Sequence, residues 1–443
     1  MAQAALALPF AENLEQSQAT RVNPIRIPAA DSKSAGAALL AACFLLVLAA
    51  NALAHGERAQ EPSLRLSTIQ WYDTKWSSDR IGVNQELTLS GRFHVMANWP
   101  LEIPSPAGLT FLNVGVPGPV FIRTASVVNG VNGASSMSLA LGQDYEYRIV
   151  LRGRIPGRYH VHPMLDVRDT GPILGPGKWV SVAGDAAAFT DPVMTLTGQR
   201  LDLAHYGLSA IVRWHLVWIV IALLWLGYWI RKPLLMPRYE AVQAGNGDRL
   251  ITRTDRIAAA IMLALTLIVA TGETVLTNIT YPVTVPLQSN QTKVPALPSS
   301  PAQITLVPEQ VTYLVPGRAV QFRLRVTNLS PKPIRFGEFT TANLRFLNRS
   351  VVEAESDYPQ DLIAPAGLVV RPGEPIAPGA SEEVYVEATS SVWETDRLTA
   401  LMSDPTNRIG GLFMFFAPDG ERSLVEFSSP IVPTFTQPVR AAR

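Results

Sequence analysis

The chain contains very little cysteine and little charge. Its 443 residues include a single cysteine, Cys43, which excludes an intramolecular disulfide, a CxxC redox pair and any metal site built from several thiolates. Charged residues make up 16% of the chain, against about 25% in an ordinary soluble domain. The 37 Lys and Arg balance 36 Asp and Glu, so no global field attracts nucleic acid. We therefore expect no nucleic-acid partner.

Common catalytic templates are also missing. The GxSxG, GxGxxG and HExxH motifs are absent, and Cys43 lies in an apolar N-terminal stretch, which argues against thiol catalysis. Acidic side chains are present on patterned segments, but we interpret them as solvated strand and loop residues rather than as a hydrolytic pair. These residues are Asp144, Glu146, Asp166 and Asp169.

Three apolar segments account for much of the low charge content. The first, residues 35–54, has no charged residue and ends in Ala52-Leu53-Ala54, a pattern typical of a signal-peptidase site. Cleavage there would make His55 the mature N-terminus and would remove Cys43. The alternative is an uncleaved anchor helix, since about 20 apolar residues can span a bilayer.

The other two apolar segments, residues 208–230 and 257–279, predict a transmembrane hairpin. The loop between them, residues 231–256, carries six Lys or Arg against three Asp or Glu. The positive-inside rule places such a loop in the cytoplasm. Both flanking regions would then lie outside, which agrees with an N-terminal signal peptide.

The two flanking regions are predicted to be β domains. Residues 55–200 contain short runs in which apolar and polar side chains alternate, separated by Pro and Gly turns, and residues 302–443 repeat this pattern. Such spacing is typical of β-sandwiches or small barrels. The polar, Pro-rich residues 288–301 are interpreted as a linker. The expected fold class is mostly β, with two sandwich domains joined by a two-helix hairpin.

A pair of histidines is the strongest candidate metal site. His160 and His162 lie in a predicted strand, so their side chains point to one face with Cα atoms about 6.5 to 7 Å apart. After cleavage, His55 would offer its α-amine and ring together. Nitrogen ligands without thiolate suit copper, although zinc remains chemically possible. The alternative interpretation is a solvated strand pair without metal.

Three other histidines have ordinary structural explanations. His94 lies on an alternating strand and is interpreted as a half-buried structural residue. His205 and His215 flank or enter the second apolar segment, where an interfacial position is the simplest interpretation, although an ionisable group in a membrane is a functional candidate by default.

From His55 to the C-terminus the chain resembles the B subunit of the particulate methane and ammonia monooxygenases. The motifs that carry this resemblance are His55-Gly56-Glu57-Arg58, Thr68-Ile69-Gln70-Trp71-Tyr72-Asp73, Gly91-Arg92-Phe93-His94, Phe111-Leu112-Asn113-Val114-Gly115, Pro117-Gly118-Pro119-Val120-Phe121, His160-Val161-His162-Pro163 and Gly175-Pro176-Gly177-Lys178-Trp179. The resemblance implies two exported cupredoxin-like domains and a copper site formed by His55, His160 and His162. It implies a component of a copper-dependent monooxygenase that hydroxylates ammonia, methane or short alkanes with O2.

The same resemblance implies partners and a location. Two polytopic membrane partners, the A and C subunits, would assemble with this chain into a trimer of heterotrimers in an inner or intracytoplasmic membrane, in contact with lipid. The oxygen-activating centre of the family has been placed in different subunits, so this chain could be a copper-holding scaffold. A membrane-anchored copper carrier without a catalytic complex is the alternative from a different class.

Some family members have a second copper site, at the positions of Gln70, His94 and Glu426. Those members carry a histidine where this chain has Gln70 and a glutamine where it has Glu426. Because two of the three positions differ, the sequence disfavours a second copper site here and favours a structural role for His94.

Overall fold

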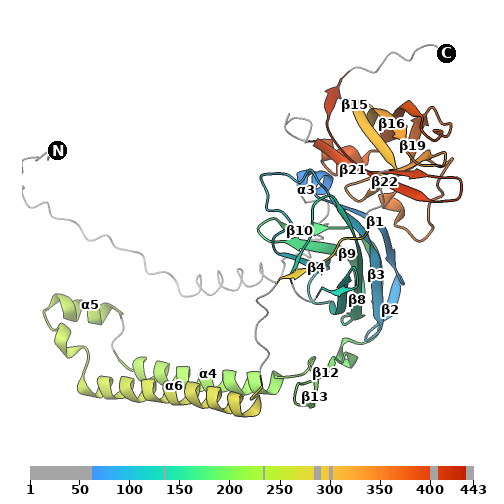
Figure 1. The fold of residues 1–443 in the computed structure, drawn as a ribbon. Coiled ribbons are helices and arrows are strands. Elements are labelled where there is room, and N and C mark those ends of the chain that lie inside the picture. Colours follow the sequence, from blue (N-terminus) through green and yellow to red (C-terminus); the bar gives the residue numbers. More distant parts are fainter. Residues whose placement is uncertain are drawn as a thin grey trace, which may run out of the picture. The chain divides into compact units, whose positions relative to one another are not determined.

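The computed structural model describes residues 62–133, 136–232, 235–283, 291–298, 303–399 and 408–435. In this part of the chain two β-sandwich domains are accompanied by two long apolar helices (Figure 1). The expected mostly β fold class is therefore confirmed. The expected signal peptide, residues 1–54, and His55 lie outside the described residues.

The N-terminal sandwich consists of two sheets around one core. In spatial order the first sheet contains β1 (Ile69–Trp76), β3 (Glu86–Val95), β8 (Gln143–Gly153), β5 (Phe121–Val128) and β6 (Val131–Asn132). The second contains β14 (Thr292–Lys293), β7 (Met137–Ser138), β4 (Thr110–Gly115), β9 (Gly157–Val167), β11 (Lys178–Ala183) and β2 (Arg80–Gly82), with β10 (Gly171–Leu174) paired to β9. Outside these sheets lie η1 (Ala186–Ala188) and the hairpin of β12 (Pro192–Met194) and β13 (Arg200–Asp202).

Alternation along the strands produces this core. On β3, Leu87, Leu89 and Phe93 are fully buried, while Glu86 and Arg92 are exposed. Period-2 geometry places alternate side chains on opposite faces of the sheet. The buried face carries the aromatic rings of the core, and Phe93 stacks on Tyr145 with ring centroids 5.3 Å apart.

The C-terminal sandwich has the same construction. Its first sheet contains β19 (Leu368–Arg371), β20 (Ser381–Thr389), β16 (Ala319–Asn328), β15 (Ile304–Leu314) and β23 (Val432–Thr434). Its second contains β18 (Leu344–Leu347), β17 (Arg335–Thr341), β21 (Arg408–Phe416) and β22 (Arg422–Pro430), and two short helical turns, η3 (Gln360–Leu362) and α7 (Val392–Thr395), accompany the sheets. Phe322, Phe339 and Phe413 pack together at its centre.

The helical hairpin consists of α4 (Leu208–Trp229) and α6 (Arg253–Thr280), which contact each other. Both are long and apolar enough to cross a membrane. Between them lie α5 (Leu235–Gln243) and η2 (Gly247–Arg249). The third apolar segment begins at residue 257, but α6 begins four residues earlier because Thr252 and Asp255 form a capping box. Lys232, just after the end of α4, forms an ion pair with Asp255 in the first turn of α6, with Nζ 2.9 Å from Oδ1.

Part of the predicted linker belongs to the N-terminal domain. Within residues 288–301 the structure describes 291–298, where β14 pairs in parallel with β7. Val294 is buried in the N-terminal core, and the Leu297 amide donates to the Asp144 carbonyl oxygen at 3.0 Å. An apolar residue in a Pro-rich stretch can thus extend a sheet where that sheet leaves an edge strand unpaired.

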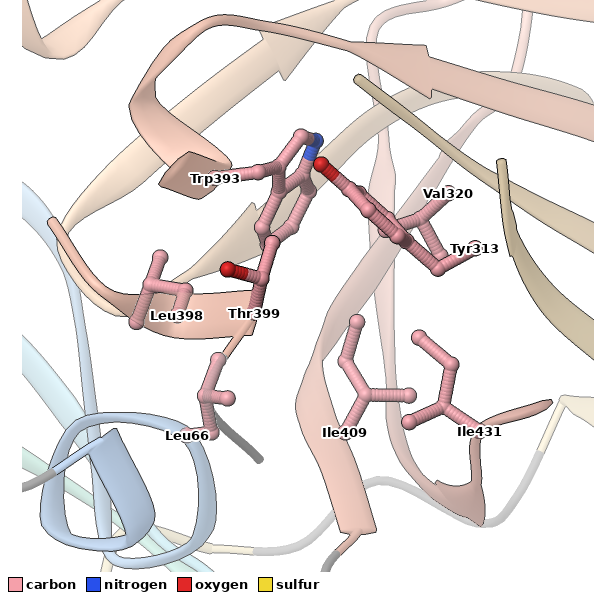
Figure 2. A pocket seen from close by; sticks show the side chains of 8 residues that line it. All are labelled: Leu66, Tyr313, Val320, Trp393, Leu398, Thr399, Ile409 and Ile431. Atoms are coloured by element: carbon pink, nitrogen blue, oxygen red, sulfur yellow. The ribbon is translucent and has the colours of Figure 1, made fainter. Parts of the chain in front are cut away.

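The two sandwiches contact each other through polar and apolar residues. Tyr72 of β1 packs against Leu412 and Met414 of β21. The short helix α3 (Pro62–Ser67) precedes β1, yet its Leu66 belongs to the core of the C-terminal domain. Figure 2 shows Leu66 in the lining of an apolar pocket of that domain, together with Tyr313, Trp393 and Ile409.

Candidate metal centre

The two histidines of the predicted HxH pair lie side by side on β9. Their ring centroids are 4.4 Å apart, with the ring planes at 84°. His162 is buried, with 5% of its surface exposed, and His160 is half-buried. Because alternate residues of a strand share a face, the strand itself brings these rings together.

The protonation of His162 is set by its neighbour Gly175. The Nδ1 atom of His162 lies 2.8 Å from the Gly175 carbonyl oxygen. A carbonyl oxygen only accepts hydrogen bonds, so Nδ1 must carry a proton, and in the neutral ring the lone pair lies on Nε2. A ring nitrogen that keeps its lone pair, in a ring held by a hydrogen bond through the other nitrogen, is the usual state of a metal-binding histidine.

The loop from Gly175 to Gly177 packs directly on the histidine pair. A Cβ atom added to Gly177 would lie 2.2 Å from Cε1 of His162 and 2.6 Å from Cε1 of His160. A Cβ added to Gly175 would lie 2.7 Å from Pro163 and 2.9 Å from Trp71. Only glycine therefore lets this loop approach the two rings and place its carbonyl against His162.

His160 is covered on one side by an aromatic ring. Trp179 of β11 is its cross-strand partner, and the ring centroids are 5.0 Å apart. The guanidinium of Arg158 lies 5.0 Å from the Trp179 ring. These contacts limit the rotation of His160 and restrict solvent on that side.

The donor set of this pair fits a copper ion. The two imidazoles lie edge to face, and in the neutral form of His162 the lone pair is on Nε2. Among the described residues no group of three or more His, Cys, Asp or Glu is arranged to hold a metal. His55, the predicted third ligand, lies outside the described residues.

The candidate second site has a different arrangement. Gln70 is fully buried, and its amide donates to the carbonyl oxygens of Arg65 and Leu66, both at 3.2 Å. Its Oε1 accepts from the Ala342 amide at 3.2 Å. Although Gln70 is the cross-strand partner of His94, its side chain forms hydrogen bonds with backbone groups of other residues.

His94 lies between two carboxylates. Its Nδ1 is 3.1 Å from Asp144 Oδ1 and its Nε2 is 2.8 Å from Glu426 Oε2. Burial by itself would lower the pKa of His94, but the hydrogen bonds with Asp144 and Glu426 raise it to about 9. At neutral pH the ring is therefore a cation that donates through both nitrogens.

Asp144 differs from its expected role as a solvated strand residue. Besides pairing with His94, it accepts a hydrogen bond from the Tyr72 hydroxyl at 2.9 Å. Burial opposes its ionisation, but the hydrogen bond from His94 lowers its pKa. The sequence offered no signal for this contact, because Tyr72, His94 and Asp144 come from three different strands.

A second ion pair joins the two domains. Arg422 of β22 forms a bidentate pair with Asp73 of β1, with Nη1 at 2.7 Å from Oδ1. Burial opposes the charge on Asp73, but the hydrogen bonds from Arg422 lower its pKa. Arg422 also lies over the Tyr72 ring, 5.6 Å from its centroid. The sequence carries no signal for this pair, because the two residues are 349 positions apart.

The family is decided by comparison with known proteins. Residues 56–435 match the family model that describes the B subunit protein of monooxygenases. The chain belongs to the monooxygenase B-subunit family. This monooxygenase subunit is 42% identical over 388 residues to the particulate methane monooxygenase alpha subunit of Methylococcus capsulatus (strain ATCC 33009 / NCIMB 11132 / Bath). The match covers 87% of this chain and 94% of that protein. The family expected from the sequence is thus confirmed.

Solved structures show weaker likenesses. The cupredoxin domain of amoB from Nitrosocaldus yellowstonii is 16% identical, and the match covers 28% of this subunit and 91% of that chain at a TM-score of 0.22. The adhesin InvE of Yersinia pseudotuberculosis is 8% identical, and the match covers 83% of this subunit and 61% of that chain at a TM-score of 0.15. These scores are too low to carry an argument about this monooxygenase subunit.

Proposed function

We propose that this monooxygenase subunit holds a copper ion through the α-amine and ring of His55 together with His160 and His162. The observation that carries the proposal is the hydrogen bond from His162 Nδ1 to the Gly175 carbonyl oxygen, because it leaves Nε2 of the neutral ring, which lies beside His160, as the metal-binding nitrogen. Copper bound there supplies oxygen or electron chemistry, or holds the domain together. The protein would hold the two imidazoles in place, shield His160 with Trp179 and supply His55 as the terminal ligand.

Copper suits this donor set better than other metals. Among divalent first-row metals, copper binds nitrogen ligands most strongly. An α-amine has a reference pKa of about 7.7 to 8, so a metal displaces its proton at little cost near neutrality. Zinc is the competing ion, and metal counting distinguishes the two.

The complex we propose is a membrane monooxygenase that hydroxylates ammonia, methane or short alkanes with O2. Two polytopic partners, the A and C subunits, would join this chain in a trimer of heterotrimers and would select the substrate. The apolar hairpin of α4 and α6 supports membrane insertion. The basic connection between the helices supports a cytoplasmic loop, with both β domains and the copper on the opposite side in a mature chain that begins at His55.

Intact mass spectrometry with copper counting on the complex, purified in mild detergent, tests these points together. We expect a chain that begins at His55, two polytopic partners and copper that is lost in the double variant His160→Ala, His162→Ala. His205→Ala is the control, because His205 is exposed and pairs with Asp202. Copper retained in the double variant contradicts the site, and a lone chain without partners contradicts the complex.

The role of the terminal amine needs its own variant. The double substitution Ala52→Arg, Ala54→Arg removes the small residues that a signal peptidase requires. We expect the uncleaved chain to bind copper at least tenfold more weakly, because His55 then has a peptide nitrogen in place of an amine. Unchanged affinity in a chain whose mass shows residues 1–54 retained would exclude the terminal amine as a ligand.

A further inference from the structure

The turn between β17 and β18 reaches from the C-terminal domain into the N-terminal one. Thr341 pairs with Leu344, so the turn consists of Ala342 and Asn343. Both have positive φ, 49° and 68°, as in the type I′ turns that close two-residue hairpins. Asparagine tolerates this conformation, whereas alanine rarely adopts it. Both side chains are buried, with 2% and 5% of their surfaces exposed.

One side of this turn holds the segment that leads to the N-terminus. The Ala342 carbonyl oxygen accepts from Arg65 Nη2 at 3.2 Å. Arg65 is buried and also pairs with Asp396 at 3.4 Å, while the neighbouring Leu66 lies in the C-terminal core. We call residues 62–68 the N-terminal strap. Arg65 is ten positions after His55, so the strap is anchored close in sequence to the proposed terminal ligand.

The other side of the turn holds the loop that packs on the histidine pair. Asn343 Nδ2 donates to the Leu174 carbonyl oxygen at 3.0 Å. The next residue, Gly175, accepts from His162 through its own carbonyl and donates its amide to Pro163 at 2.8 Å. Asn343 is thus one peptide unit away from the bond that fixes the tautomer of His162.

We propose that the Ala342–Asn343 turn is a positioning element for the copper site. It contacts the N-terminal strap and the Leu174–Gly177 loop at the same time, so the C-terminal domain fixes the strap relative to the loop that packs on the histidine pair. Asn343 and Arg65 are positioning residues, since each acts through the backbone segment that it holds. This inference rests on the proposed copper site.

Asn343→Gly is the decisive variant. Glycine keeps the left-handed backbone and removes the amide that holds Leu174. Asn129→Gly is the matched control, because Asn129 also has positive φ, 46°, and its Nδ2 donates to the Pro295 carbonyl oxygen at 2.7 Å. That bond lies on a turn of the N-terminal domain away from the histidine pair.

Copper affinity and hydrogen exchange of the purified complex are the two measurements. A group bonded directly to a metal ligand is worth about 10- to 100-fold in affinity, and Asn343 acts one peptide beyond such a group, so we expect Asn343→Gly to weaken copper binding several-fold and to speed amide exchange across residues 174–179. Asn129→Gly should change neither. If copper binding depends on His160 and His162 and the two variants have equal copper affinity, the role of the turn is overturned. The proposed copper site is not affected by that result.

The exchange measurement separates the inference from the copper proposal. If copper does not depend on His160 and His162, the proposed site fails, and copper affinity no longer reports on the turn. Exchange across residues 174–179 then decides: faster exchange in Asn343→Gly than in Asn129→Gly shows that the turn holds the loop, and equal exchange overturns the inference.

A variant of the strap tests the other half of the turn. Arg65→Met keeps the length of the side chain and removes the donors to Ala342 and Asp396. Arg152→Met is its control, because Arg152 pairs with Asp191 at 3.2 Å within the N-terminal domain. We expect Arg65→Met to weaken copper binding several-fold and to leave exchange across 174–179 unchanged. Affinity equal to that of Arg152→Met overturns the role of the strap.

Discussion

His94 of the N-terminal domain lies 2.8 Å from Glu426 of the C-terminal domain, measured from Nε2 to Oε2. The same carboxylate accepts from the Ala97 backbone amide, at 3.0 Å and 2.9 Å for its two oxygens. Glu426 therefore accepts hydrogen bonds from a charged side chain, His94, and from a neutral backbone amide, Ala97, of the other domain. A carboxylate in this position joins the two sandwiches.

The charge of His94 makes stability depend on pH. Its pKa of about 9 in the folded protein lies above the ordinary value of 6.5. A raised folded pKa means that the stabilisation is complete below pH 6.5 and is lost as pH rises through 9. We expect the thermal midpoint of the complex to fall by several degrees over this range, for a loss of about 2 kcal/mol.

The variant His94→Gln should remove most of this pH dependence, because glutamine has no titrating proton. His205→Gln is the control and should retain it. Differential scanning calorimetry at pH 6, 7.5 and 9 measures the effect. An equal fall in His94→Gln would show that other groups cause it.

The ion pair between Asp73 and Arg422 should couple the domains. Both side chains are partly buried and the geometry is bidentate, so the pair is stronger than an exposed one. In a double-mutant cycle with Asp73→Asn and Arg422→Met we expect a coupling of about 1 to 2 kcal/mol. Additive effects of the two substitutions on unfolding would indicate no direct interaction.

Gly177 should tolerate no side chain. Gly177→Ala would bring a Cβ within 2.2 Å of the His162 ring, so the loop must move away or the ring must turn. We expect copper affinity to fall tenfold or more while the fold persists. Gly373→Ala is the control, since its Cβ would lie 3.9 Å from the Val370 carbonyl oxygen. Equilibrium titration against a copper chelator measures both, and unchanged affinity in Gly177→Ala would place the copper elsewhere.

Copper binding should weaken in acid. Protons compete with copper for the imidazoles, whose reference pKa is about 6.5, and for the α-amine. We expect occupancy at limiting copper to fall between pH 7.5 and 5, and elemental analysis after equilibration at each pH measures it. Occupancy that stays flat over this range would argue against nitrogen ligands of this kind.

The β architecture and the helices were predictable because each depends on local pattern. Alternation on a strand and a long uncharged run can be recognised within a window of about 10 to 20 residues. The apolar run that begins at residue 257 does not mark the start of α6, because a capping box at Thr252 and Asp255 lets charged residues form the first turn. Residues 291–298 have the composition of a linker, and Thr292 and Lys293 form a strand there because the edge beside β7 is open.

The interface between the domains could not be predicted in this way. Asp144 has the sequence context of a solvated residue, and only the meeting of three strands places it between Tyr72 and His94. Arg65 and Asn343 carry no motif. Their partners are 277 and 169 positions away in the chain, and no single-sequence pattern reports contacts at such separations.

The sequence by itself determined that His160 and His162 share one face, since the two-residue period of a strand leaves no alternative. It also determined the family, through motifs that depend on residue identity. Tertiary structure alone decided which nitrogen of His162 carries the proton and that His94 is a cation between two carboxylates. Both depend on polar groups brought from distant strands and loops, because the protonation of an imidazole follows the donors and acceptors around it.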